Sequence, residues 1–217
     1  MALTSPYPFA ALPSRRGHFL LESGYHTDIW LDLDTLFVDS VRIAPAITML
    51  AARLRRYECD AVCGPMTGGA LLAQALAATL RVCFFYTQPW PPPGSDPNGT
   101  RVEPKGSDPE RARARLFSAE YRLPGEMRRQ VAGSRVAVVD DVISAGSSVR
   151  ATVAALSAAR ASTVVVATLV ALGDVGIAHF RGCGIPFEAL ERREFAMWAP
   201  RDCPLCRDGA PLTVADG

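Results

Sequence analysis

Lysine is nearly absent from this sequence, and neither sign of charge dominates it. Lys105 is the only lysine among 23 basic residues, and 22 acidic residues leave a net charge of +1. A chain with so little excess charge has no global field that would attract nucleic acid or an anionic membrane. Any site for an anion must therefore be built locally.

Long apolar runs are also missing. The longest nearly apolar stretch, Val164 to Leu172, is far shorter than the ~20 residues that span a bilayer. Pro6, Pro8 and Pro13 interrupt the N-terminal residues where a signal peptide would need an unbroken apolar segment. We therefore expect a soluble, cytoplasmic protein without a membrane partner.

Cysteine and histidine are too few and too scattered to predict a disulfide framework or a metal site. Cys203 and Cys206 have zinc-knuckle spacing, but no second cysteine pair follows to supply the other two ligands. The three histidines, His18, His26 and His179, are not spaced as metal ligands either. We expect a reducing compartment and a C-terminal tail with free thiols.

Short apolar strands alternate with helices through the middle of the chain. Strands are predicted at 61–63, 82–86, 135–139 and 163–170, and helices at 41–57, 70–80 and 147–160. This alternation predicts an α/β fold, in which a central parallel sheet is flanked by helices. The ligand site of such a sheet lies at the carboxyl ends of its strands.

The remaining segments predict one domain over residues 1–217 with three appendages. Residues 17–40 alternate short apolar groups with turn residues, which indicates paired extended segments and a small N-terminal hood. Seven prolines fall between Pro89 and Pro109, so we expect residues 88–116 to form a flexible loop that acts as a lid. Residues 200–217 form a polar tail, after a last strand that begins near Phe187.

The strongest functional signal is the segment VAVVDDVISAGSSVR at 136–150. Asp140 and Asp141 follow a strand and can grip the two neighbouring hydroxyls of a ribose. Small residues then open a helix, so that backbone N–H groups and the helix N-terminus can hold a phosphate. These small residues are Ser144, Ala145, Gly146, Ser147 and Ser148. Neither a Gly-Lys-Ser/Thr loop nor a GxGxxG fingerprint occurs in the chain.

This segment resembles the phosphoribosyl pyrophosphate (PRPP) signature of type I phosphoribosyltransferases. Three other segments are similar to orotate phosphoribosyltransferases: Phe19–Gly24 to the base-contacting motif F-x-L-x-S-G, Gly64–Gly69 to the pyrophosphate motif G-P-x-x-G-G, and Cys203–Leu212 to a C-terminal ending. Together they span most of the chain. The resemblance implies the type I phosphoribosyltransferase fold.

The resemblance also implies a role for each matching residue. Asp140 and Asp141 would be catalytic on the ribose side, and would assist a Mg²⁺ ion indirectly through substrate or water. Residues 144–148 would hold the 5-phosphate. Pyrophosphate would contact Pro65, Met66, Thr67, Gly68 and Gly69. The base would contact Ser23, Gly24 and Arg150, together with His26, which could equally serve only a local turn.

Two segments depart from the family pattern. The mobile loop of the family reads R-K-x-x-K-x-H-G, and here Arg101 and Lys105 match its first and fifth positions. The resemblance makes Arg101 a pyrophosphate ligand and Lys105 catalytic, whereas a lysine in a loop is ordinarily just solvated. In the base-contacting segment, Glu22 replaces a basic residue. A negative charge there would not favour a carboxylate substrate.

The expected reaction is transfer of the phosphoribosyl group of PRPP to orotate, which gives orotidine 5'-phosphate and pyrophosphate in pyrimidine nucleotide biosynthesis. The resemblance implies a homodimer. Two alternatives stay open: a PRPP-binding regulator without turnover, and a phosphoribosyltransferase with another nucleobase as acceptor.

Overall fold

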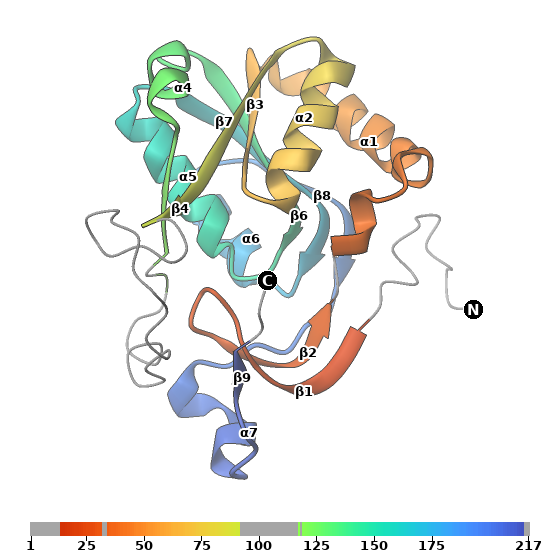
Figure 1. Cartoon of the computed structure of the whole chain (residues 1–217), viewed down its shortest axis with the longest axis vertical. Helices are drawn as coiled ribbons and strands as arrows, with labels where there is room; N and C mark the ends of the chain where they lie inside the picture. The colour runs from red at the N-terminus through yellow and green to blue at the C-terminus, as the bar shows by residue number, and fades with distance from the viewer. Residues whose placement is uncertain (1–13, 32–33, 92–116, 118, 215–217) are drawn as a thin grey trace.

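A six-stranded sheet forms the centre of the molecule (Figure 1). The computed structural model describes residues 14–31, 34–91, 117 and 119–214. The strands of this sheet are β3 (Ala61–Pro65), β4 (Cys83–Trp90), β5 (Glu120–Arg122), β6 (Arg135–Ile143), β7 (Ser162–Leu172) and β8 (Phe187–Arg193). Their order is β5-β4-β3-β6-β7-β8, and all neighbours are parallel except β4 and β5. These findings confirm the predicted parallel sheet.

Helices cover both faces of the sheet. α1 (Ser40–Leu54) and α2 (Gly68–Leu80) pack on one face, and α4 (Gly125–Gln130), α5 (Ser147–Ala158) and α6 (Val175–Gly182) pack on the other. The chain leaves β3 in one direction to form β4, and then returns to the other side of β3 to form β6. This reversal makes the carboxyl ends of β3 and β6 the expected ligand crevice of a doubly wound sheet.

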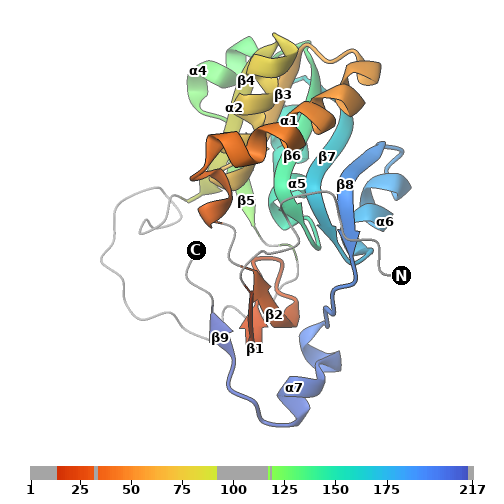
Figure 2. The same cartoon turned by 90° about the vertical axis from the view of Figure 1, so that its right-hand side faces the viewer.

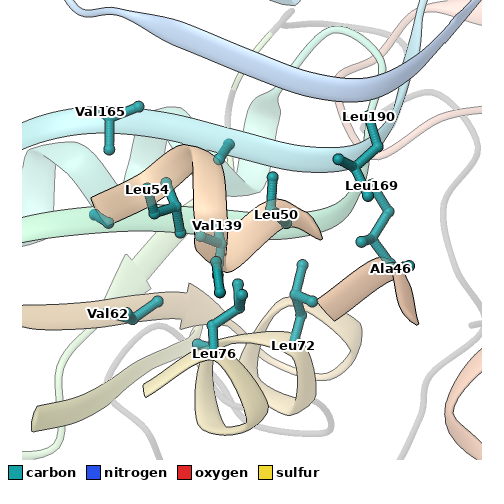
Figure 3. Close-up of a cluster of buried hydrophobic side chains, with 14 of the residues drawn as sticks. Ala46, Leu50, Leu54, Val62, Leu72, Leu76, Val139, Val165, Leu169 and Leu190 are labelled. Carbon is teal, nitrogen blue, oxygen red and sulfur yellow. The ribbon is translucent and has the colours of Figure 1, made fainter. Parts of the chain in front are cut away.

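The core consists of two apolar layers because β6 is buried on both sides. Val136 and Val138 face the α5 layer, whereas Ala137 and Val139 face the α1 and α2 layer. Figure 3 shows the layer on the side of α1 and α2, in which leucines of these two helices pack over Val139. These leucines are Leu50, Leu54, Leu72 and Leu76, and none of them is exposed. Each buried leucine stabilises the fold by about 1.5–3 kcal/mol.

A second, three-stranded sheet lies beyond the carboxyl ends of the main sheet (Figures 1 and 2). β1 (Ser14–Leu20) pairs antiparallel with β2 (His26–Leu31) and parallel with β9 (Thr213–Val214), so residues from both ends of the described chain share one sheet. The β1–β2 hairpin confirms the predicted paired segments. Residues Asp34–Phe37 form a 3₁₀ turn (η2) instead of continuing them.

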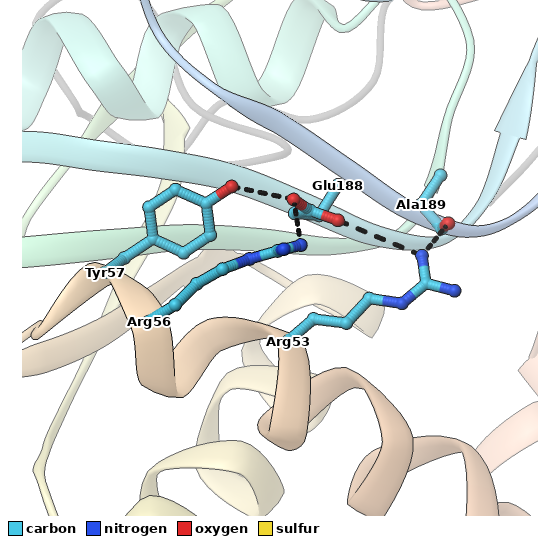
Figure 4. A network of polar contacts seen from close by, with 5 residues as sticks. All are labelled: Arg53, Arg56, Tyr57, Glu188 and Ala189. Atoms are coloured by element: carbon cyan, nitrogen blue, oxygen red, sulfur yellow. Dashed lines mark hydrogen bonds and ion pairs between the residues drawn. The ribbon is translucent and has the colours of Figure 1, made fainter.

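Both ends of α1 are held by polar contacts. Asp39 caps the N-terminus, where its Oδ1 accepts hydrogen bonds from the backbone N–H groups of Val41 and Arg42 at 3.0 Å. Beyond the C-terminus of α1, in the 3₁₀ turn η3 (Arg55–Tyr57), Arg56 Nη2 and Tyr57 Oη donate to Glu188 Oε1 of β8 at 2.6 and 2.7 Å (Figure 4). These contacts join α1 to the edge of the sheet.

Several boundaries differ from the prediction. β6 continues to Ile143, so the acidic pair lies inside the strand rather than after it. β4 continues to Trp90 and pairs with β5, so residues 88–90 of the predicted loop belong to the sheet. The tail contains the 3₁₀ turn η4 (Pro200–Asp202), the short helix α7 (Pro204–Arg207) and β9, which were not predicted. No helix in the described ranges has the length and apolar character needed to cross a membrane.

Candidate active site

Asp140 is a buried carboxyl group near the carboxyl end of β6. Only 7% of its surface is exposed. Its Oδ2 accepts a hydrogen bond from Ser148 Oγ at 3.0 Å, and its Oδ1 accepts one from the backbone N–H of Asp141 at 3.1 Å. Burial, and secondly the charge of Asp141, raise the pKa of Asp140 well above its ordinary value of 3.8. Burial in the free protein therefore disfavours the charged form of this carboxyl group.

The predicted pyrophosphate loop packs directly against the acidic pair. A Cβ atom at Gly68 would overlap the carboxylate of Asp141, and one at Gly69 would lie 2.6 Å from Asp140 Oδ1. A Cβ at Gly64 would overlap the backbone of Gly69. Only glycine permits this approach, so the loop after β3 and the carboxylates of β6 form one site.

The exposed part of this loop points away from the core. Met66 is 43% exposed and Thr67 is also exposed, and the peptide bond between them is cis. The backbone N–H of Met66 donates to the carbonyl of Thr87 on β4 at 2.8 Å, which fixes the loop to the sheet. The two side chains are thus available to a ligand.

The loop at 144–148 leads from β6 into α5, as expected. Gly146 has φ = 75° and is the N-cap of the helix. A Cβ there would point to the ring of Phe180, 3.2 Å from its Cε2, and so toward the core. Glycine is therefore required at this position by the backbone conformation and by core packing.

Ser147 has an unsatisfied hydroxyl group in the same loop. The residue is 8% exposed, and its Oγ is buried without a hydrogen bond to any described residue. A buried hydroxyl without a partner costs about 1–3 kcal/mol. An oxygen-rich ligand in this loop would remove that cost.

Two of the predicted base-contacting residues, Ser23 and Arg150, meet at Phe117, which was not predicted. The carbonyl of Ser23 accepts a hydrogen bond from the backbone N–H of Phe117 at 2.9 Å. The guanidinium carbon of Arg150 lies 3.8 Å from the centroid of the Phe117 ring, which is a close cation–π contact. Gly24, with φ = 82°, completes the turn beside Ser23. Phe117 follows the proline-rich segment, where no periodic pattern marked it.

Arg150 retains unused hydrogen-bonding capacity. Its Nε is buried and has no hydrogen-bond partner among the residues that the structure describes. Burial also lowers the pKa of the Arg150 guanidinium, although arginine stays charged at neutral pH. A half-buried cation whose Nε–H group no described residue pairs is suited to an anionic or carbonyl-rich ligand.

Glu22 is held by a tyrosine. Tyr121 Oη donates a hydrogen bond to Glu22 Oε1 at 2.8 Å. Partial burial of the Glu22 carboxyl group raises its pKa, and the bond from Tyr121 opposes this rise. The acidic residue that departs from the family pattern is therefore bonded to β5.

The remaining predicted residues are not brought to this site. His26 lies in a different cluster, where its Nδ1 is 2.9 Å from Nε2 of His18 and 3.3 Å from Sγ of Cys206. Arg101 and Lys105 lie outside the described residues, as does most of the predicted loop.

Comparison with known proteins shows which family this chain is similar to. The family model of the phosphoribosyl transferase domain matches residues 38–177. The curated orotate phosphoribosyltransferase of Thermotoga maritima is 28% identical over 195 residues, which cover 90% of this chain and 87% of that protein.

Two solved structures share the fold at 21% identity. Orotate phosphoribosyltransferase from Aeropyrum pernix has a TM-score of 0.57 and covers 82% of this chain and 87% of its own. Adenine phosphoribosyltransferase from Thermoanaerobacter pseudethanolicus has a TM-score of 0.53 and covers 76% and 88%. The fold is thus that of the type I phosphoribosyltransferases, as predicted. Because the matched residues run from just before α1 into α6 and include the acidic pair and both glycine loops, the chain belongs to the phosphoribosyl transferase domain family.

Proposed function

We propose that this phosphoribosyltransferase uses PRPP to convert orotate into orotidine 5'-phosphate, with release of pyrophosphate. The observation that carries the proposal is the single site formed by Asp140, Asp141, the 64–69 loop and the 144–148 loop. It provides acidic groups for a ribose between two loops suited to anions. Such an arrangement matches PRPP, which carries a phosphate at one end of its ribose and a pyrophosphate at the other.

Each part of the site has a role in this proposal. Asp140 and Asp141 hold the ribose hydroxyls, and the 144–148 loop holds the 5-phosphate, which gives Ser147 Oγ a partner. The 64–69 loop, together with Arg101 and Lys105, faces the pyrophosphate. As the bond from the anomeric carbon to pyrophosphate breaks, positive charge develops on the ribose. The carboxylates then stabilise this charge in a site that is already organised.

Mg²⁺ fits the donor set of this site. Asp140 and Asp141 are hard oxygen donors, and the Asp141 carboxylate lies directly against the 64–69 loop. These two residues would hold the ion indirectly, through substrate or water. When bound, Mg²⁺ would supply charge neutralisation to the departing pyrophosphate. A cation nearby would also offset the raised pKa of Asp140 and favour its charged form.

Orotate as the acceptor is supported by Arg150 and by the curated relative. The guanidinium of Arg150 over Phe117 offers a bidentate partner for the carboxylate of the base, near the backbone of Ser23. A different nucleobase is the second candidate, because Glu22 lies two residues from Gly24 on the same turn and would repel a carboxylate. The bond from Tyr121 and the raised pKa of Glu22 reduce that repulsion.

One assay separates these readings. Pyrophosphate release from PRPP should require orotate, and uracil or adenine in its place should give about 10²-fold less. Arg150→Lys keeps the charge but loses the planar fork, so it should raise KM for orotate about tenfold and leave that for PRPP nearly unchanged. Release with adenine or uracil but not orotate would contradict the orotate assignment. PRPP binding without release for any base would indicate a regulator.

The same proposal covers the whole chain. We propose that residues 1–217 act as one domain in a cytoplasmic homodimer, with residues 17–40 as a hood over the base. Chromatography with light scattering would measure the mass of the assembly, for which twice 23.3 kDa is expected.

A further inference from the structure

Four side chains of metal-ligand type converge at the small sheet. His18 comes from β1, His26 from the start of β2, Cys203 from the residue before α7, and Cys206 from α7 itself. One ligand atom from each lies within 4.8 Å of all the others. In the sequence only the cysteine pair has the spacing of metal ligands, because the histidines lie about 180 positions earlier in the chain.

The spacing of these atoms matches a tetrahedral zinc site. His18 Nε2 lies 2.9 Å from His26 Nδ1, 3.5 Å from Cys203 Sγ and 3.7 Å from Cys206 Sγ. His26 Nδ1 lies 3.3 Å from Cys206 Sγ. Zn–N bonds of about 2.0–2.1 Å and Zn–S bonds of about 2.3 Å put ligand atoms about 3.3–3.8 Å apart in a tetrahedron. The pair of nitrogens needs to separate by only a few tenths of an ångström.

The surroundings orient the ligands for a metal. His18 Nδ1 lies 2.9 Å from the carbonyl of Ala210, which can only accept a hydrogen bond. Nδ1 is therefore the protonated nitrogen, and Nε2 carries the lone pair that faces the other three ligands. A backbone carbonyl behind a histidine is the usual outer support of a zinc ligand. His18, His26 and Cys203 are 4%, 1% and 0% exposed, whereas Cys206 closes the site on the solvent side.

We propose that His18, His26, Cys203 and Cys206 bind one Zn²⁺ ion as a structural Cys₂His₂ site. Two thiolates and two imidazoles favour zinc over Mg²⁺, which prefers oxygen ligands. Four protein ligands leave no open position for a substrate, so the ion has no catalytic role.

The zinc ion fastens the C-terminal segment to the N-terminal hairpin. Backbone pairing between these parts is sparse: Phe19 and Leu20 of β1 pair with β9, and His26 forms an isolated bridge with Trp198. The hairpin turn carries Ser23, whose carbonyl bonds Phe117 beside Arg150. Zinc therefore stabilises the β1–β2 hairpin, which forms most of the hood at residues 17–40.

The amount of zinc bound per chain tests the proposed site directly. Protein freed of any histidine tag and purified without chelators should contain about one zinc per chain by mass spectrometry. Cys206→Ser keeps the size of an accessible side chain and should lower zinc occupancy about tenfold or more. Cys183→Ser is the matched control, because Cys183 is also exposed and its Sγ lies 3.9 Å from a histidine, His179, without a second pair. Its zinc content should equal that of the unmodified protein.

A second measurement does not depend on a variant that folds. Replacement of zinc by Co²⁺ in the unmodified protein should give the intense visible bands of a tetrahedral site and the near-ultraviolet band of thiolate ligation. Far-ultraviolet circular dichroism verifies that Cys206→Ser is folded. A chain that takes up neither metal when each is supplied in excess would overturn the proposal. Equal zinc in Cys206→Ser and Cys183→Ser, or a disulfide between Cys203 and Cys206 in the fresh protein, would do the same.

Discussion

Gly146 shows how one residue serves the fold and the ligand site together. Its φ of 75° is unfavourable for any residue with a Cβ, and the added atom would contact Phe180. Gly146→Ala should therefore lower the free energy of unfolding by about 1–2 kcal/mol, as measured in urea, and weaken PRPP binding through the displaced loop.

Gly182→Ala is the control for this substitution. Gly182 ends α6 with open space around its missing side chain, so the change should be neutral or stabilising by a few tenths of a kcal/mol. Equal unfolding midpoints for the two variants would contradict the structural reason given for Gly146.

The raised pKa of Asp140 predicts that the free energy of unfolding depends on pH, and that the charged form needed for the proposed function is the less stable one. Its raised pKa means that, above pH 3.8, the folded state keeps a proton that the unfolded state has released. The free energy of unfolding contributed by this group is therefore full below that pH and falls as the pH rises toward the folded pKa. Asp140→Asn removes the fall, and it should raise the melting temperature of the free protein at pH 7 by about 2–4 °C.

The same variant should lose about 10²-fold or more in turnover, because a charge that stabilises the transition state is gone. Thermal unfolding between pH 4 and pH 8 measures the first effect, with Glu194→Gln as an exposed control. If the melting temperature of Asp140→Asn depended on pH as that of the unmodified protein does, burial would not raise the pKa of the Asp140 carboxyl group. Full activity would remove Asp140 from the site.

At the scale of elements, a hydroxyl pair joins β4 to α5. Thr87 Oγ1 and Thr152 Oγ1 lie 2.6 Å apart, and neither residue is exposed. Thr152→Val leaves the Thr87 hydroxyl buried without this partner, which should cost about 1–3 kcal/mol in urea unfolding.

The double variant Thr87→Val/Thr152→Val should recover part of this loss, because no buried hydroxyl is then left alone. Thr48→Val changes an exposed hydroxyl on α1 and should cost less than about 0.5 kcal/mol. If the double variant lost as much free energy of unfolding as the two single variants together, the two hydroxyl groups would not be coupled.

The sheet and its helices could be predicted because apolar periodicity is a local property. β7, expected at 163–170, lies at Ser162–Leu172, and α2, expected at 70–80, begins two residues earlier at Gly68. The missed features depend on distant partners. β4 reaches Trp90 only because β5, some thirty residues later, pairs with it. α6 has eight residues and begins Val-Gly, too short and too weak a helical signal.

The residues of the candidate active site were predictable from the sequence to a similar degree. Local motifs identified the acidic pair and both loops, and the topology brought them together. Two features were missed: Phe117, and the cluster of His18, His26, Cys203 and Cys206. Contacts between residues that are distant in the chain leave no pattern in a single sequence.

For the whole molecule, the proposed homodimer leads to a test by subunit mixing. The family resemblance implies that Lys105 acts in the site of the neighbouring subunit. Lys105→Ala should lower turnover about 10²-fold, with a smaller change in PRPP affinity, because its charge matters most as pyrophosphate leaves.

Mixed dimers of Lys105→Ala with Asp141→Asn subunits should then regain one intact site, and activity should exceed that of either parent. Native mass spectrometry verifies that the dimers are mixed. If verified mixed dimers show no recovery, Lys105 acts within its own subunit or has no part in turnover.

The sheet shared by β1 and β9 has a consequence for how the protein is made. Phe19 pairs with Thr213, so the hairpin leaves the ribosome nearly two hundred residues before its partner strand exists. At about 5–20 residues per second, that interval is on the order of 10–40 s. During this time the main sheet, whose strands all lie between the two partners, can fold first. The small sheet of β1, β2 and β9 would then be completed last, after synthesis of the parallel sheet, and a ribosome that stalls before Thr213 would carry a folded core whose small sheet lacks β9.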